Sequence, residues 1–272
     1  MAVKRKTTRL RGGNILEIEE YHDGNYGAPG KGRQKKKKPT KEQVAYINQL
    51  NKARRCRLRL LEYMNEGDYF GTWTYRKSER PPDMAAALKD FDRAIRKVRA
   101  WYRKQGYELF WIRNIERGTR GAWHIHFVMN RIPRAAEVIT GAWTHGGTYI
   151  TEIRSSEFRD EDFTRLGNYL TKSEKTREAK ADGSPGKPRI REASYSHSRN
   201  MPLPEPEVDK LRRWKKEVKP KKGYYIARIH EGINPATGYK YRRYTMIRLE
   251  RKDYESEKRK CRSNQKKRKK GG

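Results

Sequence analysis

The chain has 272 residues, enough for one sizeable domain with appendages or for two small domains. Its 67 Lys and Arg residues outnumber its 33 Asp and Glu residues, which gives a formal net charge of +34. This excess of positive charge predicts a polyanionic partner, with nucleic acid preferred over an anionic membrane surface. Two cysteines are too few for a disulfide framework or a cysteine-based zinc finger, and they suit a reducing cytoplasm.

Membrane and secretory signals are absent from the sequence. No apolar stretch approaches the ~20 residues that a membrane span needs. The N-terminal stretch MAVKRKTTRLRGG lacks the apolar segment of a secretory signal. We therefore expect a cytoplasmic protein that does not engage a membrane.

Polar, basic segments flank a central part that is richer in aromatic and apolar residues. The N-terminal segment ends in a run of lysines that suits contact with phosphates. Thr40 is a candidate cap for the helix that follows it. In chain order we expect a disordered basic arm (1–39), a basic helical segment (40–67), a compact domain (68–206), a basic helix at about 206–218 with a β-hairpin (207–250), and a disordered basic tail (251–272).

The central part alternates strand and helix signals. Aromatic and β-branched runs predict strands, and apolar residues at intervals of three and four predict amphipathic helices. The predicted elements are a strand (68–76), a helix (84–105), two strands (107–116 and 122–130), a helix (133–143), a strand (147–153), a helix (160–175) and a loop (176–206). Such short connections favour an antiparallel sheet with helices packed on one face, an α+β fold.

The stretch GAWHIHFVMN (121–130) places two histidines one residue apart within an apolar strand. Side chains two residues apart on a strand share a face, so His124 and His126 point the same way. Antiparallel pairing through the turn ERGTRG brings Glu116 close to them. Two imidazoles and a carboxylate with open positions suit a divalent cation such as Mg²⁺ or Mn²⁺, and equally a non-haem iron.

A second pair of candidate residues lies in the stretch NYLTK. Tyr169 and Lys172 are three apart on a predicted helix and are therefore neighbours on its surface. Tyr169 falls at the border of the buried face, where its hydroxyl can reach the edge of the sheet. On this helix alone, a tyrosine that only packs at the interface is an equally good interpretation.

The order of these motifs resembles the HUH endonucleases, and among them the rolling-circle replication initiators of filamentous phages and small bacterial plasmids. YFGTWTY (69–75) resembles the first motif strand, HIH the paired-histidine motif, and NYLTK the Y-x-x-K nucleophile motif. SYSHSRNMPLPEP (194–206) resembles a segment that follows the nucleophile helix. The resemblance covers roughly residues 68–206 and implies an RRM/ferredoxin-like sheet.

The resemblance implies a single-tyrosine enzyme that nicks one strand of origin DNA. A divalent metal, Mg²⁺ or Mn²⁺, would be held by Glu116, His124 and His126. Tyr169 would attack the phosphodiester to give a 5′-phosphotyrosine and a free 3′-hydroxyl primer, with Lys172 stabilising the charge, and the strand would later be rejoined.

The implied partners are single-stranded or supercoiled origin DNA, a host helicase and a host DNA polymerase, in the cytoplasm of a bacterial cell. A host helicase is expected because the sequence contains no G-x-x-x-x-G-K-[ST] phosphate loop.

Three alternatives remain at this point. A single-tyrosine HUH transposase would use the same chemistry in a different transaction. A non-catalytic basic nucleic-acid-binding protein would contain the two histidines by coincidence. A two-histidine-one-carboxylate iron oxygenase usually sits in a double-stranded β-helix, which the helix-rich order of elements does not suit.

Overall fold

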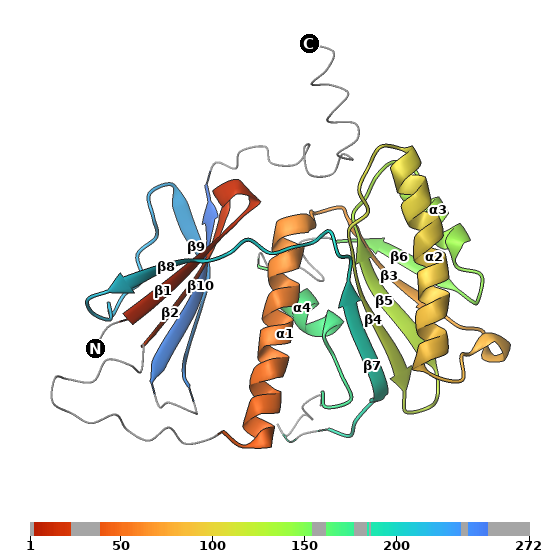
Figure 1. Ribbon diagram of the computed structural model, residues 1–272, viewed down its shortest axis with the longest axis horizontal. Coiled ribbons are helices and arrows are strands. Elements are labelled where there is room, and N and C mark those ends of the chain that lie inside the picture. The colour runs from red at the N-terminus through yellow and green to blue at the C-terminus, as the bar shows by residue number, and fades with distance from the viewer. Residues whose placement is uncertain are drawn as a thin grey trace, which may run out of the picture. The chain divides into compact units, whose positions relative to one another are not determined.

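The computed structural model describes residues 3–22, 39–153, 162–176, 184, 186–234 and 239–249. The chain divides into two compact units, Met1–Asn51 with Leu203–Tyr254 and Lys52–Pro202 with Glu255–Gly272. Each unit contains a five-stranded antiparallel sheet, and helices accompany the sheet of the second unit (Figure 1). The predicted α+β class is therefore confirmed.

The first unit joins both ends of the chain in one sheet of strand order β8-β1-β2-β10-β9. Its strands are β1 (Val3–Leu10), β2 (Ile15–His22), β8 (Glu207–Leu211), β9 (Tyr224–Ile233) and β10 (Lys240–Arg248). Leu16 and Ile18 of β2 pack against Tyr244 and Met246 of β10, which form the core on one face of this sheet. The predicted hairpin is confirmed, because β9 and β10 pair in antiparallel register.

Two predictions for this unit are wrong. Residues 3–22 of the supposed disordered arm form β1 and β2, and the supposed helix at 206–218 contains β8, which pairs with β1. Both errors have one cause: these strands are polar and obtain their stability from partners at the far end of the chain, which local composition does not reveal. The predicted basic tail (251–272) lies outside the described residues.

A buried ionic network links three strands of the first unit. Glu20 of β2 is 1% exposed and accepts hydrogen bonds from Arg242 at 2.6 Å, Arg5 at 2.7 Å and the Tyr244 hydroxyl at 3.0 Å. Burial opposes ionisation of Glu20, but the hydrogen bonds from Arg5 and Arg242 outweigh it and hold the carboxyl pKa below its ordinary value. The charge on Glu20 therefore compensates two guanidinium groups at once.

We expect Glu20→Gln to lower the free energy of unfolding of the first unit by about 3 kcal/mol, because it leaves buried guanidinium charge uncompensated. In the wild type, the stability that Glu20 contributes is complete above the ordinary Glu pKa and is lost as the pH falls through the lowered value. Urea unfolding at several pH values measures both effects. Glu231→Gln is the control, because its carboxylate also faces Arg242, at 3.8 Å, but is mostly exposed; a destabilisation as large as that of Glu20→Gln would contradict the account.

The second unit is built on a sheet of strand order β6-β3-β5-β4-β7. In chain order the elements are α1 (Lys41–Tyr63, from Lys52 onward in this unit), β3 (Tyr69–Thr74), α2 (Met84–Lys104), β4 (Trp111–Gly118), β5 (Trp123–Met129), α3 (Ala135–Ala142), β6 (Thr148–Glu152), α4 (Thr164–Leu170) and β7 (Ile190–His197). The helix predicted at 160–175 is shorter than expected, and the loop predicted at 176–206 contains β7, which pairs with β4.

Local signals explain where the two long helices begin. Thr40 and Gln43 form a reciprocal capping box at the start of α1, with hydrogen bonds of 3.2 and 3.0 Å. The Asp83 carboxylate accepts from the Ala86 amide at 2.8 Å and caps α2. Among the described helices, none combines the length and the apolar composition that a membrane span requires.

Helices cover both faces of this sheet (Figure 1). Apolar residues of α2 and α3 pack on the face that carries Trp73, Ile125 and Phe127, and this is the larger core. Gly71 of β3 is required beside Phe127, because a Cβ at this position would lie 2.4 Å from the Phe127 ring. On the other face α4 covers the strands that carry the two histidines.

Candidate active site

The register of three strands assembles the candidate site. His124 and His126 lie on the central strand β5, and β4 places Glu116 opposite His124 and Asn114 opposite His126. On the other side, β3 places Thr72 opposite His126. The apolar residues that alternate with the histidines are buried in the core beneath. The predicted shared face of the two histidines and their proximity to Glu116 are therefore observed.

His126 is the buried member of the pair, with 8% of its surface exposed. Its Nδ1 lies 3.0 Å from the Thr72 hydroxyl and its Nε2 lies 3.7 Å from the Glu116 carboxylate. Burial, together with the charges of His124 and Lys172, lowers the pKa of His126 to about 4. Its imidazole is therefore neutral at pH 7, and neutral imidazole is the form that binds metals.

Glu116 is held by an asparagine that the sequence does not single out. Burial raises the pKa of Glu116 to about 7, although the Lys172 charge and a 2.8 Å hydrogen bond from Asn114 act in the opposite direction. The same Asn114 amide donates to the Lys172 carbonyl at 3.0 Å. Asn114 is fully buried and thus ties the carboxylate to the end of α4. Its position two residues before Glu116 on one strand face is the only signal in the sequence.

Helix α4 brings Tyr169 and Lys172 to the histidines. The Tyr169 hydroxyl lies 3.4 Å from both ring nitrogens of His126, and the Lys172 ammonium lies 4.6 Å from the Tyr169 ring centroid. Burial and the nearby Glu116 charge raise the pKa of Tyr169 to about 12. A phenol in this state is a weak nucleophile unless a positive charge stabilises the phenolate.

Close packing against α1 fixes the position of α4. A Cβ at Gly167 would lie 3.2 Å from the Arg57 Cβ, so the two helices approach at a glycine. Arg57 also pairs with Asp162, just before α4, at 3.3 Å. The helix that carries Tyr169 is therefore held from its start as well as from its end.

His124 occupies the solvent side of the site. Its ring centroid lies 6.0 Å from that of His126, and partial burial together with the Arg80 charge lowers its pKa. As placed, the described residues contain no group of three or more His, Cys, Asp or Glu side chains close enough to hold a metal ion. The donor types nevertheless fit a divalent cation, because two neutral imidazoles and one carboxylate share a face and Thr72 engages the Nδ1 of His126.

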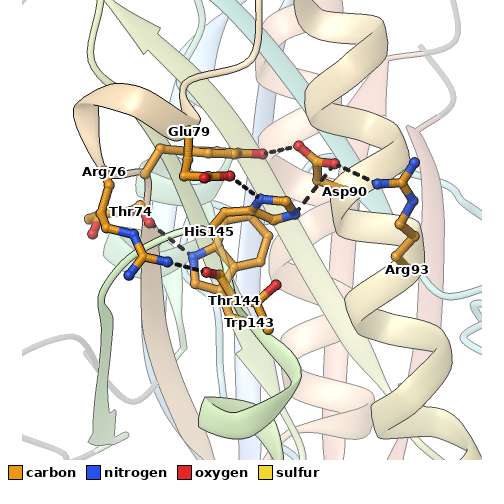
Figure 2. A network of polar contacts seen from close by, with 9 residues as sticks. Thr74, Arg76, Glu79, Asp90, Arg93, Trp143, Thr144 and His145 are labelled. Atoms are coloured by element: carbon orange, nitrogen blue, oxygen red, sulfur yellow. Dashed lines mark hydrogen bonds and ion pairs between the residues drawn. The ribbon is translucent and has the colours of Figure 1, made fainter.

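A polar network fixes the end of β3 beside this site (Figure 2). His145 lies between two carboxylates, with Nδ1 3.2 Å from Glu79 and Nε2 3.6 Å from Asp90. The Trp143 indole donates to the Thr74 carbonyl at 2.9 Å, and a Cβ at Gly146 would lie only 2.0 Å from the same oxygen. The network therefore holds the end of the strand that positions Thr72.

Residues 68–174 match the model of a family described as replication-associated protein, of the ORF2 type. The matched segment runs from β3 through α4 and contains every residue of the candidate site. No curated protein and no solved structure matches this chain significantly. The match indicates a replication-associated protein.

We expect Asn114→Asp to destabilise the second unit by about 3 kcal/mol, because a carboxylate would face the Glu116 carboxylate and the Lys172 carbonyl where an amide now donates to both. Thermal unfolding measures the destabilisation, and hydrogen exchange of the α4 amides shows whether the helix end is released. Asn168→Asp makes the same chemical change at an exposed position of α4. Equal stability of the two variants would show that Asn114 does not tie α4 to the sheet.

Proposed function

We propose that the chain is a metal-dependent DNA endonuclease that nicks one strand of origin DNA with Tyr169 as nucleophile and so initiates rolling-circle replication. The observation that carries this proposal is the Tyr169 hydroxyl, 3.4 Å from both nitrogens of His126. The match of residues 68–174 to a replication-associated family and the net charge of +34 support DNA as the substrate. Single-stranded or supercoiled DNA, a host helicase and a host polymerase are the partners that this function requires in a bacterial cytoplasm.

The proposed metal ligands are Glu116, His124 and His126, with Mg²⁺ or Mn²⁺ as the cation. When bound, the cation would offset negative charge on the non-bridging oxygens of the scissile phosphate. His126 is suited to this role because its pKa of about 4 keeps the ring neutral. Thr72 engages Nδ1, which leaves Nε2 on the side of Glu116.

Tyr169 performs the covalent step. Its phenolic oxygen bonds to phosphorus as the bond to the 3′ oxygen breaks, which leaves a 5′-phosphotyrosine and a 3′-hydroxyl. The phenolic proton is released to solvent, and the departing oxygen takes up a proton. The Lys172 ammonium stabilises the phenolate that burial disfavours. Attack of a DNA 3′-hydroxyl on the same linkage rejoins the strand.

We expect wild-type protein, Mn²⁺ and supercoiled DNA carrying the element's own origin to yield protein linked to a 5′ end of the DNA. EDTA and Tyr169→Phe should each abolish the linkage, because the first removes the metal and the second the nucleophilic oxygen. Denaturing electrophoresis with end-labelled DNA measures it.

Tyr149→Phe is the matched control, because Tyr149 is 64% exposed on β6 and lies outside the proposed site. This variant should form the adduct as the wild type does. Tight DNA binding without adduct or nick in the wild type would favour a non-catalytic nucleic-acid-binding protein instead.

We expect Lys172→Met to slow single-turnover nicking of a single-stranded oligonucleotide by about 100-fold, because it removes a positive charge placed beside the forming anion. The affinity for DNA should change little, so the effect appears in the rate constant. Lys175→Met removes an equal charge from an exposed position shortly after α4 and should keep the wild-type rate. An equal effect of the two substitutions would assign Lys172 only a general role in binding.

A further inference from the structure

A basic pocket lies on the sheet of the second unit where α2 meets strand β7, at the sheet edge. It encloses about 590 Å³, a volume typical of ligand sites. Its lining holds five arginines against two carboxylates, Asp92 and Glu108. The arginines are Arg96, Arg99 and Arg103 of α2, Arg113 of β4, and Arg199 after β7.

The pocket lies on the sheet face opposite to the histidines. Arg113 alternates with Asn114 along β4, so its side chain points away from the candidate active site. Its guanidinium carbon lies 4.9 Å from the ring centroid of Phe91 on α2. The pocket is therefore a feature separate from the site around Tyr169.

Two buried donors in the pocket lining lack an acceptor. Trp111 and Arg113 of β4 are 8% and 5% exposed, and the Trp111 Nε1 and the Arg113 Nε are buried with no hydrogen-bond partner in the described structure. The other side of the Arg113 guanidinium donates to the Ser194 carbonyl at 2.6 Å. Buried donors are normally satisfied, so two of them two residues apart on one strand face indicate a place for an acceptor ligand.

The α2 side of the pocket presents uncompensated positive charge. Arg99 and Arg103 are one helical turn apart, where like charges repel each other. Within the described part of the chain, neither of them nor Arg199 forms an ion pair or a hydrogen bond through its side chain. An anion between them would relieve the repulsion and accept hydrogen bonds from the planar guanidinium groups.

We propose that this pocket binds a phosphate of the DNA backbone and gives the second unit a DNA-binding surface on the face opposite to the histidines. The choice of DNA among phosphate-bearing ligands rests on the proposed function. Arginines, serines and an asparagine supply the donors, and such interactions hold a strand in position without reading its sequence. The strand held here is a segment other than the one at Tyr169, because the two sites lie on opposite faces of one sheet.

The test compares two double variants in full-length protein that carries Tyr169→Phe, so that no cleavage intervenes. Arg99→Gln/Arg103→Gln removes two charges from the pocket, and Lys89→Gln/Lys104→Gln removes two exposed charges from α2 outside it. Fluorescence anisotropy with a labelled single-stranded oligonucleotide of mixed sequence gives the affinity at several salt concentrations.

We expect the pocket variant to bind about tenfold more weakly and to lower the slope of log affinity against log salt concentration by about 0.7 for each DNA phosphate that the protein no longer neutralises. The control variant should keep the wild-type affinity within about twofold. Equal weakening in the two variants would overturn the proposal, since it would reflect net charge alone.

A second measurement follows the Trp111 indole N–H resonance, assigned through Trp111→Phe. The oligonucleotide should shift this resonance in the parent protein and not in Arg99→Gln/Arg103→Gln. A shift with inorganic phosphate but none with the oligonucleotide would assign the pocket to a small anion and overturn the proposal. Because neither measurement requires nicking, a failure of the proposed enzymatic function leaves both results interpretable, and a failure of the pocket leaves adduct formation at Tyr169 unaffected.

Discussion

The pairing register of β3, β5 and β4 is the constraint on which the candidate site depends. It places Thr72, His126 and Asn114 in one row across three strands, with His124 and Glu116 in the next row. The register is fixed from the opposite face, where the apolar residues of β5 are buried under α2 and α3. A slip by one residue would turn the histidines into that core and the apolar residues towards α4, so packing of the core sets the geometry of the site.

Burial shifts three ionisable groups of the site towards their neutral forms. The pKa of Glu116 rises to about 7, that of His126 falls to about 4, and that of Tyr169 rises to about 12. Lys172 is the positive charge that opposes the shift of Glu116. A further cation held by Glu116 and the histidines would favour the anionic forms of both the carboxyl and the phenol. The electrostatics therefore fit a site that becomes active when positive charge and a phosphodiester arrive together.

Strong local periodicity is what made parts of the fold predictable. The apolar spacing of α2, the alternation in β5 and the short turn before it were sufficient to bring Glu116 to the two histidines, and the spacing within NYLTK placed Tyr169 at their edge. Asn114 and Thr72 could not be predicted, because a single polar residue on a strand acquires a role only through the partner that the register gives it. The polar strands β1, β2, β7 and β8 were not predicted for a related reason: each is stabilised by pairing with residues distant in sequence, and β1 and β2 by a buried ion network as well.

The most direct test of the central claim identifies the amino acid that becomes linked to DNA. The covalent product formed with Mn²⁺ and origin DNA is digested with nuclease and trypsin, and the modified peptide is sequenced by mass spectrometry. The account predicts a nucleotide phosphate on Tyr169 within the peptide LGNYLTK, between Arg165 and Ser173. A phosphate on a different residue would contradict the assignment of α4 as the nucleophile helix.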